Sequence, residues 1–272
     1  MKIGKILILI DLGEETPSLL RYGFQLAQTL KANVWLQHIY YIPPDLVGEV
    51  FIPSEALKKY EKKVFREYKK LKKGTLSEIA EPHFIVSHGD LVEKANQLID
   101  QENIDLVVVG NQGGGLSTNI LGSNTLKLIH HAHCQVLSVP KQAEFKPFMR
   151  MAFATDWQDT SATLLQRIKD FVQLFNAHLD IIHVSEKHER REVSIEVTGM
   201  ADLSHTFYYH WAKDVEEGLQ QHVAEYQNDL IVLIPHHHDF FDRLFRRSVT
   251  RQMVFHSHVP LLTLHESFVS QG

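Results

Sequence analysis

Residues 110–125, GNQGGGLSTNILGSNT, form a glycine-rich segment of the kind that can surround a phosphate group. Glycine is unfavourable inside regular structure, so such a loop indicates backbone that passes where a side chain would obstruct a ligand. Gly110 and Gly113 let the backbone curl with its N–H groups inward, and Gly122 precedes a helix whose first amides are unpaired. Short polar side chains at the same end belong to Ser123, Asn124 and Thr125.

This segment matches neither standard nucleotide-binding motif. It has no GK[ST] ending, and no G-x-G-x-x-G follows the first expected strand. By itself it is equally consistent with a nucleotide site and with an ordinary tight turn.

Composition narrows the class of protein. The chain has 272 residues, of which 44% are hydrophobic and 22% charged, which is typical of a soluble globular protein with up to two domains. A net charge of -5 argues against nucleic acid as the main partner. No apolar run is long enough for a signal peptide or a membrane span, so we expect no membrane partner. The chain has a single cysteine, Cys134, which excludes an internal disulfide and fits a cytoplasmic protein. We expect its side chain to be buried in the core.

The chain contains an internal repeat. Residues 6–39 align without a gap on residues 151–184, so that Asp11 meets Asp156 and His38 meets His183. Residues 110–140 align in the same way on residues 235–265. The second copy is shorter in its middle, because the lysine-rich stretch at about 54–73 has no counterpart before the strand expected at about 206–211.

Strands and helices are expected to alternate within each copy. In the first copy, apolar runs predict strands at 5–10, 33–39, 81–87, 104–110 and 134–140. Helical patterns start at Thr16, taken as the N-cap, and at about 54, 90 and 123. This alternation predicts an α/β fold with a parallel sheet covered on both faces. Ligands of such sheets bind beyond the carboxyl ends of the strands, where Asp11 and Gly110 would meet.

The order of these features resembles the universal stress protein family. The family signature is G-x2-G-x9-G-[ST] followed by a helix and a last strand, and here GNQGGGLSTNILGSNT precedes CQVLSVP, with the strand DLVVVG before it and Asp11 after the first strand. Eight residues, rather than nine, separate Gly113 from Gly122. The resemblance implies two flavodoxin-like domains of five parallel strands in the order 3-2-1-4-5, at residues 1–141 and 149–268.

The resemblance also implies ATP as ligand, with or without Mg. Carried over by position, Asp11 and Leu12 would lie beside the base and ribose, and Ile39 and Tyr40 over the adenine. The residues implied around the phosphates are Gly110, Gly113, Gly122, Ser123, Asn124 and Thr125.

The second copy lacks this chemistry. Pro235, His238 and Arg247 stand where the first copy has its three motif glycines. Proline has no amide hydrogen, and the other two place side chains where the backbone should approach a ligand. We therefore expect a degenerate second domain that acts as a built-in partner docked through the last strands, while two such chains could associate further as a homodimer.

Other interpretations stay open. The chain could be an interaction scaffold that binds no nucleotide, or zinc could bind near Asp156 through His236 or His238, although surface histidines are the simpler explanation. His38 and His183 occupy equivalent strand ends, which favours a hydrogen-bonded structural role. No catalytic constellation is apparent, so we do not expect an enzyme, although slow ATP hydrolysis would be compatible. The lysine-rich helix is expected to cover the sheet with a solvated face rather than to dock on nucleic acid or a membrane.

Overall fold

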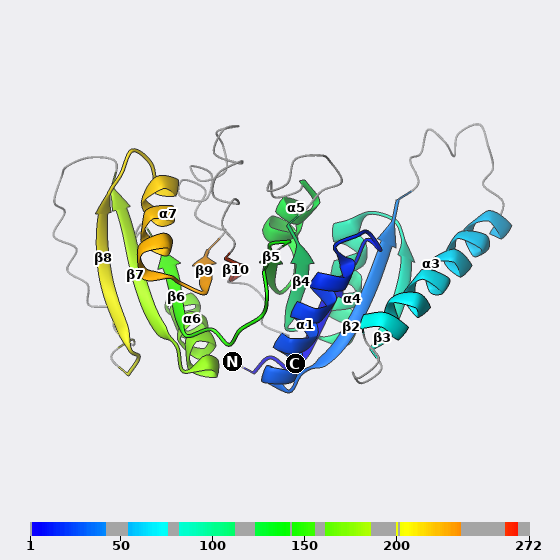
Figure 1. Cartoon of the computed structure of the whole chain (residues 1–272), viewed down its shortest axis with the longest axis horizontal. Coiled ribbons are helices and arrows are strands. Elements are labelled where there is room, and N and C mark those ends of the chain that lie inside the picture. The colour runs from blue at the N-terminus through cyan, green and yellow to red at the C-terminus, as the bar shows by residue number, and fades with distance from the viewer. Residues whose placement is uncertain are drawn as a thin grey trace.

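The computed structural model describes residues 2–41, 54–75, 82–111, 123–141, 143–155, 161–185, 200, 202–234 and 259–265. Two halves follow one another along the chain (Figure 1). The elements of the first half are β1 (Lys5–Leu9), α1 (Thr16–Leu30), β2 (Asn33–Tyr40), α3 (Ser54–Thr75), β3 (His83–His88), α4 (Leu91–Glu102), β4 (Leu106–Gly110), α5 (Ser123–His131) and β5 (Gln135–Val139). Those of the second half are β6 (Arg150–Ala154), α6 (Ala162–Phe175), β7 (His178–Ser185), β8 (His205–Trp211), α7 (Val215–Tyr226), β9 (Leu230–Leu233) and β10 (Leu261–Thr263).

The ten strands of the described residues form one sheet, in the order β3-β2-β1-β4-β5-β10-β9-β6-β7-β8. When the strands of each half are numbered from the first strand of that half, both halves have the order 3-2-1-4-5. Every strand pair within a half is parallel. The predicted α/β fold class is therefore confirmed. The domain boundaries at 141 and 149 stay a prediction. None of the helices in the described residues combines the length and apolar composition that crossing a membrane requires.

The halves meet through their last strands. β5 and β10 are antiparallel, with Leu137 opposite Leu262 at the centre of the pairing. The Thr263 hydroxyl donates to the Val136 carbonyl at 3.3 Å, and the His265 amide donates to Gln135 Oε1 at 2.8 Å. The sheet therefore continues from one half into the other without a break.

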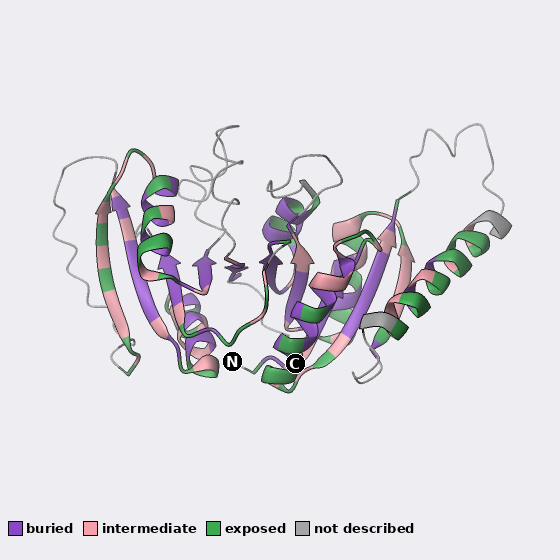
Figure 2. Ribbon diagram, viewed as in Figure 1, coloured by how far each residue is buried: buried purple, intermediate pink, exposed green. Residues whose placement is uncertain are grey.

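Two apolar clusters run through both halves, one on each face of the sheet. One cluster includes Leu20 of α1 and Phe171 of α6, together with Phe148 from the connection between the halves. The other includes Ile99 of α4, Leu128 of α5 and Leu219 of α7. Figure 2 shows this as buried strands flanked by helices whose outer sides are exposed. Cys134 belongs to the second cluster and is 5% exposed, as predicted for packing.

Local signals explain most helix ends. The Asp90 side chain accepts from the first amides of α4, and the Ser161 side chain does the same for α6. The prediction that Thr16 is the N-cap residue of α1 is wrong. Glu15 is the N-cap and makes no side-chain hydrogen bond to the helix, whereas the Thr16 hydroxyl donates to Asp11 at 3.0 Å.

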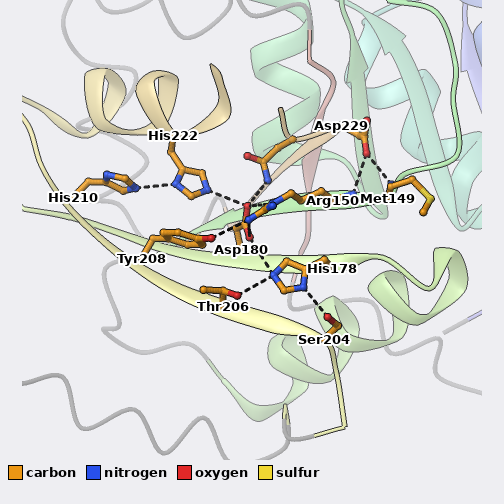
Figure 3. Close-up of polar contacts among 11 residues, drawn as sticks. Met149, Arg150, His178, Asp180, Ser204, Thr206, Tyr208, His210, His222 and Asp229 are labelled. Atoms are coloured by element: carbon orange, nitrogen blue, oxygen red, sulfur yellow. Dashed lines mark hydrogen bonds and ion pairs between the residues drawn. The ribbon is translucent and has the colours of Figure 1, made fainter. Parts of the chain in front are cut away.

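A buried ionic cluster holds the second half together around Asp180 (Figure 3). The fully buried carboxylate of Asp180 accepts from Arg150 Nε at 2.6 Å and Nη2 at 2.9 Å, and from Asn228 Nδ2 at 2.8 Å. His222 Nε2 lies 3.1 Å from the same carboxylate. Burial alone would raise the pKa of Asp180, but the hydrogen bonds from His222, Arg150 and Asn228 lower it to about 2.

Two further histidines extend this cluster. His210 Nε2 lies 2.8 Å from His222 Nδ1. In the tautomer of His222 that donates to Asp180 through Nε2, Nδ1 is the acceptor for the Nε2–H of His210. His178 Nε2 lies 3.4 Å from Asp180 Oδ1. Burial lowers the pKa of both His178 and His210, so each is stabilised in its neutral form.

We predict a two-step loss of stability in acid. The folded chain binds fewer protons at these groups than the unfolded chain, so the free energy of unfolding falls as the pH falls. Protonation of the two histidines lowers the free energy of unfolding below about pH 6.5. Protonation of Asp180 lowers it further between about pH 3.9 and the folded pKa of about 2. Asp180→Asn should lower the free energy of unfolding by about 3 kcal/mol near neutral pH, because it leaves the Arg150 charge without its carboxylate. It should also make the acid limb shallower.

Urea unfolding across a pH series measures both effects. Glu144→Gln, which removes an exposed carboxylate, serves as the control and should change neither. An acid limb of equal slope in Asp180→Asn and the unmodified chain would contradict this assignment.

Candidate functional site

A cleft of about 780 Å³ lies at the carboxyl ends of β1, β2, β4 and β5. This volume is typical of small-molecule sites, which range over about 300–1,000 Å³. Its walls come from those strand ends and from the first turns of α1 and α5. Six of the ten predicted site residues line it: Asp11, Ile39, Tyr40, Gly110, Asn124 and Thr125.

The remaining predicted residues are placed differently. Leu12 is not among the residues that line the cleft, since its side chain packs against the apolar cluster on the α1 face. Ser123 begins α5, but its side chain lies outside the described part of the chain. Gly113 and Gly122 also lie outside it.

Asp11 shapes the turn between β1 and α1. Its Oδ1 accepts from the Gly13 amide at 2.8 Å and from the Thr16 hydroxyl at 3.0 Å. Leu12, between them, has a φ of 61°, which is unusual for a residue with a branched side chain. Within the described residues, the second carboxylate oxygen of Asp11 has no hydrogen-bond partner, so it can accept a hydrogen bond from a hydroxyl group of a ligand.

Aromatic rings form the wall of the cleft at the end of β2. The ring centroids of Tyr40 and Tyr60 are 4.6 Å apart, and those of Tyr40 and His88 are 5.1 Å apart. Burial, Glu61 and Tyr60 all raise the pKa of Tyr40, so its hydroxyl stays protonated at neutral pH. Tyr41, which is 62% exposed, also lines the cleft beside Tyr40 and Tyr60. Such a surface suits the flat face of a heterocycle.

His38 also lines the cleft, but its ring is held within the protein. Nδ1 lies 3.0 Å from the Ile10 carbonyl, and Nε2 lies 3.3 Å from the Tyr60 hydroxyl. His183 repeats the first contact in the second half, with Nδ1 3.2 Å from the carbonyl of Thr155, the residue that aligns with Ile10. Both histidines are thus hydrogen-bonded to the backbone after the first strand of their own half, as predicted.

Thr125 anchors α5 rather than offering its hydroxyl proton to a ligand. The side chain is buried, and its Oγ1 donates to the Gly110 carbonyl at 3.0 Å. This bond holds the first turn of α5 beside the end of β4. Asn124, which is exposed and lines the cleft, is the described side chain at that helix end that can reach a ligand.

The charges of the described walls are mostly negative. Asp11, Glu14 and Glu15 line the cleft together with Lys141, whose Nζ lies 2.7 Å from Glu15. The hydrogen bond to Glu15 raises the pKa of Lys141 and keeps it charged. A phosphate group here would therefore need the backbone amides at the α5 end or an accompanying cation.

Several residues that were not predicted for the site also line the cleft, among them Glu14, Glu15, Tyr60 and Lys141. A signal existed for Tyr60, which stood on the apolar side of the lysine-rich helix, but nothing in the sequence placed that helix over the cleft. Lys141 directly follows the last strand of the first half, where cleft residues of parallel sheets are expected.

The predicted zinc alternative is not tested by the described residues. Asp156, His236 and His238 lie outside them, as do Pro235 and Arg247. Within the part of the chain that the structure describes, no group of three or more potential metal ligands comes together.

Substitution of Gly110 tests whether packing within the protein requires a glycine at this position in the cleft. A Cβ built at Gly110 would meet only Leu19 Cδ2 at 3.8 Å among the described residues, which is an ordinary contact. We predict that Gly110→Ala changes the free energy of unfolding by less than about 1 kcal/mol. Gly218→Ala is the matched control, because its Cβ would lie 2.6 Å and 2.9 Å from the two methyl groups of Val184, and should cost about 2 kcal/mol. Urea unfolding of both variants measures this, and a large loss in Gly110→Ala would mean that protein packing requires this glycine.

Known proteins share both the sequence pattern and the architecture. The universal stress protein family model matches residues 2–140 and 205–265. Universal stress protein G of Shigella flexneri is 37% identical over 54 residues, which are 20% of this chain and 38% of that protein. Universal stress protein Slr1101 of Synechocystis is 49% identical over 45 residues, 16% of this chain and 42% of that protein. The matched segments thus span less than half the length of these relatives.

Solved structures resemble the whole chain. The crystal structure of a universal stress protein from Archaeoglobus fulgidus superposes with a TM-score of 0.70 at 16% identity, covering 98% of this chain and 97% of that one. A putative universal stress protein from Pseudomonas aeruginosa gives a TM-score of 0.57 at 13% identity, covering 97% and 93%. At such identities these likenesses concern the fold alone. Since the family model covers more than half of the residues, in both halves of the sheet, the chain belongs to the universal stress protein family.

Proposed function

We propose that the first half binds an adenine nucleotide, ATP, in the cleft at the carboxyl ends of β1 and β4, and that the second half acts as a built-in partner. The observation that carries this proposal is the gathering of six predicted ligand residues around one cleft of about 780 Å³. These residues come from three elements, β2, β4 and α5, and from the turn after β1, and their convergence is what a small-molecule site requires.

The two ends of the cleft suit the two ends of a nucleotide. The rings of Tyr40, Tyr41 and Tyr60 offer a surface for the base, and Asp11 offers a carboxylate oxygen for a ribose hydroxyl. At the other end, Gly110 leaves room beside the start of α5, whose unpaired amides suit phosphate oxygens.

The negative walls favour binding of the nucleotide together with a divalent cation. Three carboxylates line the described part of the cleft, and its one ammonium group is paired with Glu15. Mg bound to the phosphates would lower their net charge and reduce repulsion from these carboxylates.

We assign no catalytic residue to this site. His38, the described histidine in the cleft, is bonded to the Ile10 carbonyl and faces the Tyr60 hydroxyl, so neither ring nitrogen is placed for proton transfer to a ligand. The proposed role is ligand-dependent signalling through a protein surface in the response to stress.

Thermal melting with and without millimolar Mg-ATP tests the proposal. At a ligand concentration of about 100 times Kd, binding to the folded state alone should stabilise the chain by about 2.7 kcal/mol, which is a readily measured shift. Gly122→Arg, which copies Arg247 of the second repeat, should abolish the shift. Gln25→Arg, which places the same side chain on the exposed side of α1, should leave it intact.

The same experiment separates this function from a scaffold that binds no nucleotide. A scaffold would melt at the same temperature with and without Mg-ATP and would carry no nucleotide through purification, as judged by mass spectrometry. Either a shift that survives Gly122→Arg or the complete lack of a shift would contradict nucleotide binding at this cleft.

A further inference from the structure

Between residues 57 and 73, whose side chains the structure describes, the exposed side of α3 carries charge of one sign only. Ten residues between 57 and 73 are exposed, and none of them is acidic. Two are aromatic, Tyr60 at 39% and Phe65 at 43% exposure. The other eight form what we call the basic face: Lys58, Lys59, Lys62, Lys63, Arg66, Lys69, Lys70 and Lys73.

Helix geometry makes this face continuous. At 3.6 residues per turn, its eight positions fall within an arc of about 140°, opposite the buried Val64 and Tyr68. Tyr68 stacks on Phe84 of β3 with ring centroids 4.0 Å apart, which fixes the orientation of the helix. Of the three acidic residues of the helix, Glu61 and Glu67 lie outside this arc. Glu55 falls within it by the same geometry, but it precedes the stretch from Lys58 to Lys73 that the basic face occupies. A surface that serves solubility alone usually mixes both signs, and this one does not.

The charge of α3 is also opposite to that of the rest of the chain. The helix has nine basic and three acidic residues, a charge of +6 in a chain of net charge -5, so the remainder carries -11. Figure 1 shows α3 at one end of the elongated molecule. Ion pairing on the basic face is recorded, within the described residues, for Lys70 alone, whose Nζ lies 2.9 Å from Glu67.

We propose that the basic face of α3 docks an acidic, amphipathic segment of a partner protein. The face runs for about 22 Å, from Lys58 to Lys73, which is the length of a peptide segment. The rest of the chain has a net charge of -11, so repulsion opposes a partner whose negative charge extends well beyond this face, such as a long nucleic acid or an anionic membrane. The partner that matches both the charge and its limited extent is a short acidic segment.

The side chains of the basic face indicate how such a segment is recognised. Seven of the eight are lysines, which act as flexible point charges and do not impose the fixed two-pronged geometry of arginine. The face therefore selects acidic composition more than a particular sequence. Phe65 lies at one border of the arc, where it can contact apolar side chains of the segment. This docking is separate from the nucleotide cleft, because no member of the basic face lines the cleft.

Fluorescence anisotropy in 0.15 M NaCl tests the proposal with a labelled peptide of five Glu-Glu-Phe repeats. We expect binding by the full chain, and an increase in Kd of at least about tenfold when Lys62, Arg66 and Lys69 are all replaced by Glu. The matched control replaces the exposed Lys2, Lys146 and Lys213 by Glu, which changes the net charge equally, and should alter Kd less than about twofold. Circular dichroism and melting confirm that both triple variants are folded.

Further probes separate the partner classes. A peptide of five Gln-Gln-Phe repeats should not bind. A 15-base-pair DNA duplex and phosphatidylserine vesicles should bind more weakly than the acidic peptide. The proposal is overturned if the acidic peptide does not bind, if both triple variants weaken binding equally, or if DNA or vesicles bind more tightly through the same three residues.

Discussion

Three residues of β10 connect the two halves of this molecule. Leu261, Leu262 and Thr263 pair in parallel with β9 on one side and antiparallel with β5 on the other. Because β5 and β10 are the outer strands of their halves, their pairing turns two five-stranded sheets into one sheet of ten. Each face then supports a continuous apolar cluster, and the cleft of the first half is built on strands that lie directly beside this junction.

The two halves use equivalent positions for different interactions. Lys5 and Arg150 both begin the first strand of their half, and Trp35 and Asp180 both occupy the third position of the second strand. In the first half, Lys5 Nζ lies 5.2 Å from the centroid of the Trp35 ring, a cation–π contact. In the second half, Arg150 forms a two-pronged ion pair with Asp180, and its guanidinium lies over Tyr226 at 4.9 Å. The repeat thus keeps the geometry while the chemistry differs, with a cation–π contact in the first half and an ion pair in the second.

Much of this architecture could be predicted from the sequence. The apolar runs and the internal repeat predicted the strands and the place of the cleft, because burial on both faces of a parallel sheet leaves a strong pattern. The order of the strands, in contrast, was implied only by the resemblance to a known family. Side-chain roles were harder to predict. Thr125 was expected at a phosphate, yet its hydroxyl is bonded to Gly110, and Leu12 turns towards the core because its φ is positive. Such outcomes depend on local backbone geometry, which periodicity does not encode. The contribution of Tyr60 to the cleft depends on where α3 crosses the sheet, and no local pattern states that.

The position of β10 in the chain also has a consequence for biosynthesis. Thr263 of β10 donates a hydrogen bond to the carbonyl of Val136 in β5, and the two residues are 127 positions apart in sequence. The pairing of β5 with β10 therefore forms only after the other nine described strands have been synthesised, although the first half can assemble much earlier. Until then the outer edge of β5 is a template for wrong strands, including those of neighbouring nascent chains. Contacts between residues so distant in sequence also form slowly, so we expect β5 to pair with β10 more slowly than the strands of the first half pair with one another.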